Sequence, residues 1–135
     1  MSLLNKIDKW LNDAIGNADF VLDIGDWRSM DYSASTRYIR YRSNGGRSPM
    51  SDGTRGTMVM VNIVGAKESV PNFSQDDQLF ESDIIYNKAN DMLLKASNER
   101  LTDCLIQVNA IGDIIGPAHT SGDRSVVALT LEFIH

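Results

Sequence analysis

Apolar residues in the first fifteen positions recur at spacings of three and four, which is the period of an amphipathic helix. This apolar set comprises Leu3, Leu4, Ile7, Trp10, Leu11 and Ile15. Ser2 can cap the start of such a helix, and Gly16 suits the left-handed residue that commonly follows its end. We therefore predict a helix over 3–15 whose apolar stripe packs either on the protein's own core or on a partner subunit.

A second helical pattern covers residues 75–97. Its apolar positions are Ile84, Ile85, Ala89, Met92, Leu93 and Ala96. Ser74 and Asp77 have the spacing of a capping box, which predicts a start near Gln75; a start near Asp83 is the alternative. Four acids lie in its first part, where the positive end of the helix dipole favours them. They are Asp76, Asp77, Glu81 and Asp83.

Alternating apolar and polar residues predict several strands. The clearest run is 125–134, with one apolar face. That face carries Val127, Leu129, Leu131 and Phe133. Residues 57–64 alternate in the same way, and residues 19–24 suit a short strand. Residues 105–110 and 114–118 flank Gly112, which favours a hairpin with a tight turn between them.

The strand that begins near Ser35 differs because it carries charge on both faces. Arg40 and Arg42 share one face, whereas Arg37 lies on the other. This pattern favours an edge strand or a projecting ribbon. The Gly-, Ser- and Pro-rich segment 43–56 follows, so 35–64 should form a long hairpin with an irregular tip. The predicted fold class is α+β: two helices packed on one face of a mainly antiparallel sheet, with a long projecting Arg-rich hairpin, in a single domain over 1–135.

Composition narrows the class of protein. The chain has 135 residues, 42% of them hydrophobic and 23% charged, which is typical of a globular domain. Its formal net charge of −5 disfavours general binding to nucleic acid or anionic membranes. The single cysteine, Cys104, cannot form an internal disulfide or a Cys-based zinc site. The sequence contains neither a membrane-length apolar run nor a signal peptide's apolar core, so we expect a cytosolic protein without membrane contact.

Candidate chemistry is sparse. His119, Ser121 and Asp123 fall in one predicted turn, where side chains cannot easily form a catalytic triad. The only other histidine, His135, is terminal and is expected to be solvated. No metal-ligand spacing and no phosphate-binding glycine motif is present. We therefore predict that the protein is not an enzyme and has no catalytic, metal or cofactor site.

The unusual feature is a cluster of arginines with one opposing acid, Asp52, in a chain of negative net charge. The cluster comprises Arg37, Arg40, Arg42, Arg47 and Arg55. Arginine suits fixed pairing with carboxylates or phosphates. Three interpretations remain open: a solvated hairpin, pairing with an acidic protein surface, or direct contact with DNA. If the partner is another copy of this chain, Asp76, Asp77, Glu81 and Asp83 would complete the subunit interface.

The order of elements also points to a family. The helices over 3–15 and 74–96, the segment Ile111–Thr120 and the closing strand Ser125–Ile134 together resemble the tail terminator, or tail completion, proteins of long-tailed bacteriophages. The resemblance implies a structural virion protein that forms a ring, expected to be a hexamer. The ring would cap the tail tube and join it to the head connector.

Implied partners are other copies of the chain, the tail tube protein and the head–tail connector protein, with a possible passing contact with DNA. The implied location is the host cytoplasm during assembly and then the head-proximal end of the tail. Three other functions stay open. They are a head-side connector or stopper, a nucleic-acid-binding module that uses the Arg37–Arg55 hairpin, and a small enzyme with a deep pocket at His119.

Overall fold

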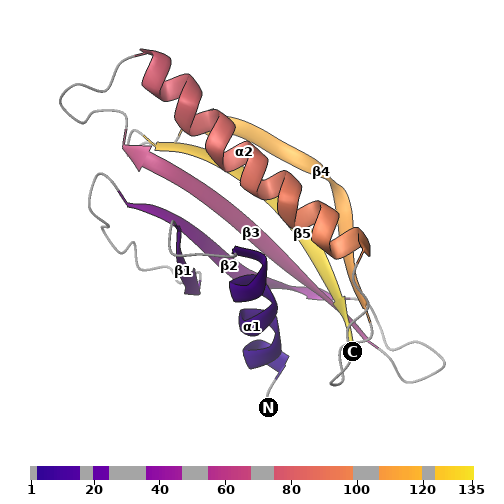
Figure 1. Ribbon diagram of the computed structural model, residues 1–135. Helices are drawn as coiled ribbons and strands as arrows, with labels where there is room; N and C mark the ends of the chain where they lie inside the picture. Colours follow the sequence, from indigo (N-terminus) through magenta and orange to yellow (C-terminus); the bar gives the residue numbers. More distant parts are fainter. Residues whose placement is uncertain are drawn as a thin grey trace.

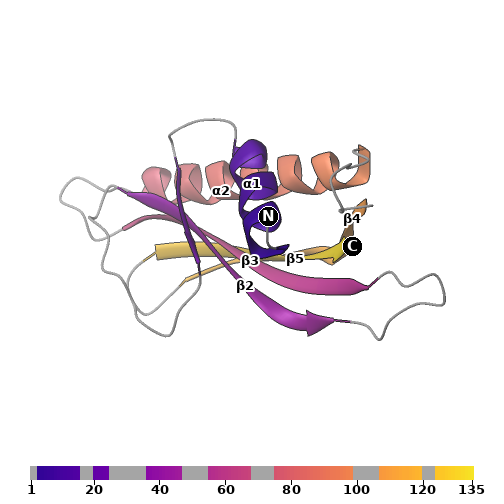
Figure 2. The ribbon, with the colours of Figure 1, turned by 90° about the horizontal axis from the view of Figure 1, so that it is seen from below.

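Two helices cover one face of a five-stranded sheet in the computed structural model, which describes residues 3–15, 20–24, 36–46, 55–67, 75–98, 107–119 and 124–135 (Figures 1 and 2). The elements in chain order are α1 (Leu3–Ile15), β1 (Phe20–Ile24), β2 (Arg37–Gly46), β3 (Gly56–Lys67), α2 (Gln75–Asn98), β4 (Gln107–His119) and β5 (Arg124–Ile134). The strand order is β1-β2-β3-β5-β4, and β1 with β2 is the parallel pair in it. The α+β class is therefore confirmed.

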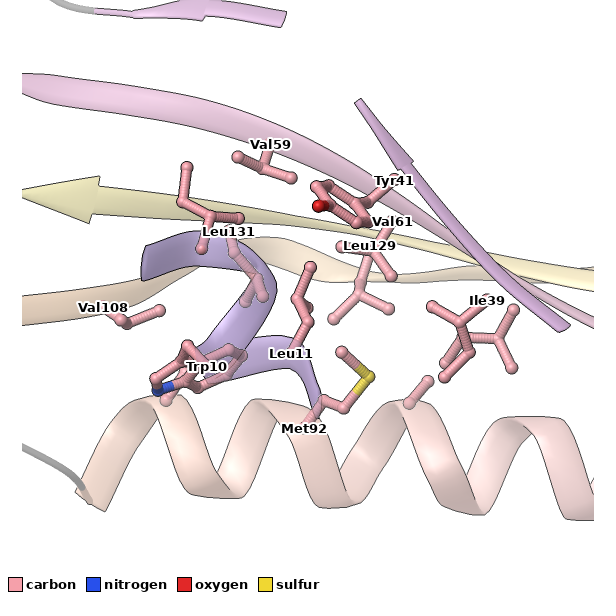
Figure 3. Close-up of a cluster of buried hydrophobic side chains, with 14 of the residues drawn as sticks. Trp10, Leu11, Ile39, Tyr41, Val59, Val61, Met92, Val108, Leu129 and Leu131 are labelled. Atoms are coloured by element: carbon pink, nitrogen blue, oxygen red, sulfur yellow. The ribbon is translucent and has the colours of Figure 1, made fainter. Parts of the chain in front are cut away.

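The core lies between the sheet and the helices. Alternate residues of β3 and β5 are buried on this face, as their apolar pattern predicts. They are Val59, Val61, Ile63, Val127, Leu129, Leu131 and Phe133. Figure 3 shows Trp10 and Leu11 of α1 between the sheet and Met92 of α2. The Trp10 ring meets the Phe133 ring edge to face, with centroids 5.6 Å apart, so α1 packs on the protein's own core.

Several element boundaries match the sequence pattern closely. The first helix covers 3–15 as predicted, and the second begins at Gln75 rather than near Asp83. The short strand predicted at 19–24 is β1. By contrast, β3 continues to Lys67, three residues beyond the predicted end of this strand at Val64.

The interpretation of β2 as an edge strand is wrong. Residues 37–41 pair with β1 on one side, and β3 pairs with β2 on the other. Ile39 and Tyr41 are fully buried, and the Tyr41 hydroxyl donates to Asp8 Oδ1 of α1 over 2.9 Å. β2 therefore lies inside the sheet over residues 37–41, although charged residues alternate along it. The hairpin tip, 47–54, lies outside the described residues, so the projecting arm stays a prediction.

The hairpin predicted around Gly112 is also wrong, because β4 is a single strand that pairs with β5 along its length. Its register shifts between Ile111 and Ile115 and again between Ile115 and Ala118. Gly112 has a φ of 73°, which glycine adopts without steric cost. Both hairpin turns and bulges use glycine in this conformation. Gly112 therefore lies in a bulge-like irregularity within a single strand, not in a turn between two strands.

Candidate assembly surface

A buried carboxylate of α2 is bound by residues of two strands. Glu81 Oε2 accepts from Arg37 Nε over 2.9 Å, and Oε1 accepts from Arg37 Nη2 over 2.5 Å. The Glu81 side chain is 6% exposed and that of Arg37 is 27% exposed. The two-point geometry fits the planar guanidinium to the carboxylate. Because this ion pair lies within one chain, it accounts for both charges without a neighbouring subunit.

Backbone groups of β3 complete this cluster. Glu81 Oε2 also accepts from the Ala66 amide over 3.1 Å. A Cβ at Gly65 would lie 3.1 Å from Glu81 Oε2, so the glycine leaves room for the carboxylate. Arg124 of β5 donates to the carbonyl oxygens of Thr36 over 2.6 Å and of Gly65 over 2.9 Å. These polar contacts fix α2 and the start of β5 to one end of β2 and β3.

The helix-free face of the sheet, called the open face below, carries arginine beside aromatic and thioether groups. Arg40 lies on this face, with its guanidinium carbon 5.0 Å from the centre of the Tyr38 ring. The Arg124 guanidinium carbon lies 5.3 Å from the same ring. Met58 and Met60 of β3 are half-buried on this face. The open face therefore carries arginine, aromatic and thioether side chains, all of them at least partly buried.

The nine residues proposed from the sequence fall into separate groups. Arg37 and Glu81 bind each other, and Arg40 is half-buried on the open face. Arg42, Arg55 and Asp83 are exposed, as an interface role requires. Arg47 lies outside the described residues. Asp76 and Asp77 belong to the start of α2, but their side chains also lie outside the described part.

Two charged residues of β5 were missed by sequence reasoning. Arg124 and Glu132 are 4% and 2% exposed, and both are on the open face of the strand. Glu132 lies in register with Met58 of β3 and Asn109 of β4. The signal available in the sequence was the partly apolar second face of this strand, which indicates contact on both sides. Alternation alone does not say that a charged residue is buried there.

The histidine positions give no assembled site within the described structure. The His119 backbone ends β4, whereas Ser121 and Asp123 lie outside the described residues. His135 is half-buried rather than solvated, and its Nε2 lies 2.9 Å from Thr57 Oγ1. In the described ranges, no three His, Cys, Asp or Glu side chains come together as metal ligands. Among the described helices, none is both long and apolar enough to span a membrane.

The fold and its charged surfaces define a small α+β protein whose observed polar contacts join helix to sheet and strand to strand. Comparison with known protein families identifies the family within this class. The sequence model of a family described as phage tail termination protein matches residues 1–135, the whole chain. The chain therefore belongs to this family of phage tail structural proteins, whose place is the virion tail. No curated protein matches it.

Proposed function

We propose that this protein forms a homo-oligomeric ring, expected to be a hexamer, that caps the tail tube and joins it to the head connector. The family match over the whole chain is the observation that carries this proposal. A cap acts by occupying the surface to which the next tube subunit would add. Joining requires the opposite surface of the same ring to bind the connector protein.

Arginines of the β2–β3 hairpin suit the contact between neighbouring subunits. In this proposal Arg40, Arg42, Arg47 and Arg55 of one copy meet Asp76, Asp77 and Asp83 of the next. Arg42, Arg55 and Asp83 are exposed, whereas Arg37 and Glu81 already pair within the chain. Charges that repel within one copy then bind opposite charges on its neighbour. A head-to-tail contact of this kind repeats until the ring closes.

The native mass and the particle test the proposal together. Purified protein should have six times the mass of the 15.0 kDa chain, and a labelled copy should bind the head-proximal end of the tail. Phage that lack the protein should produce tails of abnormal length that do not join heads, and supply of the intact protein should restore both. An unrelated protein supplied in the same way should restore neither tail length nor joining to heads.

A head-side connector or stopper gives a different result. Loss of a stopper leaves tails of normal length, because tube growth still ends correctly, while filled heads fail to retain DNA or to join tails. Label at the head vertex before tail attachment would also favour the stopper. Either observation would contradict the role as a tail cap.

A further inference from the structure

The sheet has two unlike edges, one formed by β1 and the other by β4. The described strands leave the outer side of each edge strand without a neighbouring strand. Figure 1 shows these strands at opposite margins of the sheet. An unpaired edge presents a row of backbone donors and acceptors that another strand can bind.

Exposed apolar side chains accompany both edges. Val21 on β1 is 41% exposed, and Ile111 and Ile115 on β4 are 40% and 72% exposed. The flanking residues Phe20, Leu22, Ala110 and Ile114 pack on the core. Because successive strand residues point to opposite faces, Val21, Ile111 and Ile115 all lie on the open face. Each edge therefore offers apolar contact on the same side of the sheet.

The two edges also match in length, and each carries one acidic residue, Asp23 on β1 and Asp113 on β4. The register of β4 is regular over residues 107–111, before its first shift, and β1 is five residues long. Between residues 107 and 118 the sole acidic or basic residue is Asp113. Proteins protect an exposed edge with charges, proline or bulges, and in β4 all of these come after residue 111, so residues 107–111 are weakly protected against pairing. The register shifts after Ile111 limit how long a strand it can accept.

We propose that β1 of one copy pairs with the β4 edge of the next copy, with Val21 against Ile111 and Ile115. This inference rests on the proposed ring and specifies its subunit contact. Joining unlike edges at opposite margins leaves one edge of each kind available on every pair. Further copies therefore add in one rotational sense until the ring closes. In the closed ring, the sheet of each subunit continues into the sheet of the next.

Lysine at either edge tests the contact, because a charged side chain there opposes strand addition. Val21→Lys and Ile115→Lys should each reduce the native mass from that of the ring to that of the monomer. Leu94→Lys is the matched control, since Leu94 is 53% exposed but lies on α2, away from both edges. Circular dichroism and thermal unfolding show whether each variant is folded. If Ile115→Lys does not fold, Ile111→Lys is the second variant of the β4 edge.

A mixture of the two variants tests the head-to-tail arrangement. Val21→Lys retains an intact β4 edge, and Ile115→Lys retains an intact β1 edge. The mixture should therefore form heterodimers, although each variant alone is monomeric. A β4-to-β4 contact predicts instead that Val21→Lys assembles normally and that the mixture contains no heterodimer.

The results separate this inference from the proposed ring. If both edge variants retain the ring mass, the edge contact is wrong and the ring stands. If the intact protein is monomeric at all concentrations and does not bind tails, the proposed function itself is wrong. If Leu94→Lys also dissociates the ring, the effect is not specific to the edges and the edge inference fails.

Discussion

Trp10 shows how one side chain joins both layers of the protein. It is 3% exposed and packs on Phe133, while Lys95 of α2 lies over its ring. Trp10→Ala should lower the free energy of unfolding by about 3–5 kcal/mol, because it leaves a large cavity. Lys9→Ala, an exposed change on the same helix, should alter it by less than about 0.5 kcal/mol. Urea unfolding measures both, and a loss below about 1 kcal/mol for Trp10→Ala would contradict its core role.

Removing either partner of the Arg37–Glu81 pair should destabilise the protein, but by unequal amounts. Arg37→Ala leaves a nearly buried carboxylate without its charged partner and should lower the free energy of unfolding by about 3 kcal/mol or more. Glu81→Ala should cost less, since the partly exposed Arg37 can turn toward water. Lys9→Ala, at an exposed basic residue outside this pair and outside the proposed subunit contacts, is the control and should be nearly neutral. Equal losses for all three variants in chemical denaturation would refute a structural role for the pair.

At this scale the sequence predicts apolar positions better than charged ones. Val127 and Phe133 are buried as their alternation indicates. Burying an apolar side chain away from water stabilises the folded state whatever its neighbours are. Glu81 was assigned to an acidic surface, yet it is buried against Arg37. Its partner is 44 residues away in the chain, so no local pattern indicates the pairing.

Among the elements, the β2–β3 hairpin carries the proposed charge contact. Arg42→Glu with Arg55→Glu should reduce the native mass, because both exposed residues then repel the neighbour's acids. Adding Asp77→Lys with Asp83→Lys should partly restore the ring. Trypsin should cleave the monomer within 37–55 and cleave the assembled ring there much more slowly.

Contact with DNA predicts a different outcome for the same hairpin variants. Charge reversal would abolish DNA affinity and leave the native mass unchanged. If native mass, protease protection and DNA affinity all stay unchanged, both interface hypotheses fail and the hairpin is simply solvated.

Element identity could be predicted where a single periodicity dominates, as in α1 and β5. Two failures have physical causes. Gly112 suits a hairpin turn and a bulge equally, because both need positive φ, and the choice depends on pairing with β5. In β2, the charges of Arg37 and Arg40 concealed how completely Ile39 and Tyr41 are buried. The position of β2 between β1 and β3 depends on a parallel pairing that short-range sequence does not encode.

For the whole molecule, ionic strength should distinguish the two kinds of subunit contact. The screening length falls from about 10 Å at 0.1 M salt to about 3 Å at 1 M. The proposed arginine contacts then weaken, and the apparent dissociation constant of the ring should rise about tenfold, or roughly 1.4 kcal/mol. Analytical ultracentrifugation measures this change. The neutral variant Arg42→Gln with Arg55→Gln should lose most of the salt dependence; an unchanged dependence would assign it to other charges.

The central position of β5 has a consequence for synthesis. A ribosome makes β3 and β4 before the strand that lies between them, and residue 56 finds its partner at residue 134 only after 78 further positions. Translation that stops before residue 124 therefore leaves β4 separated from β1, β2 and β3, with no strand to join them. Such a product also lacks the core residues Val127, Leu129, Leu131 and Phe133. Only copies translated through β5 can complete the native sheet, so we expect incomplete chains to be left out of the assembled tail.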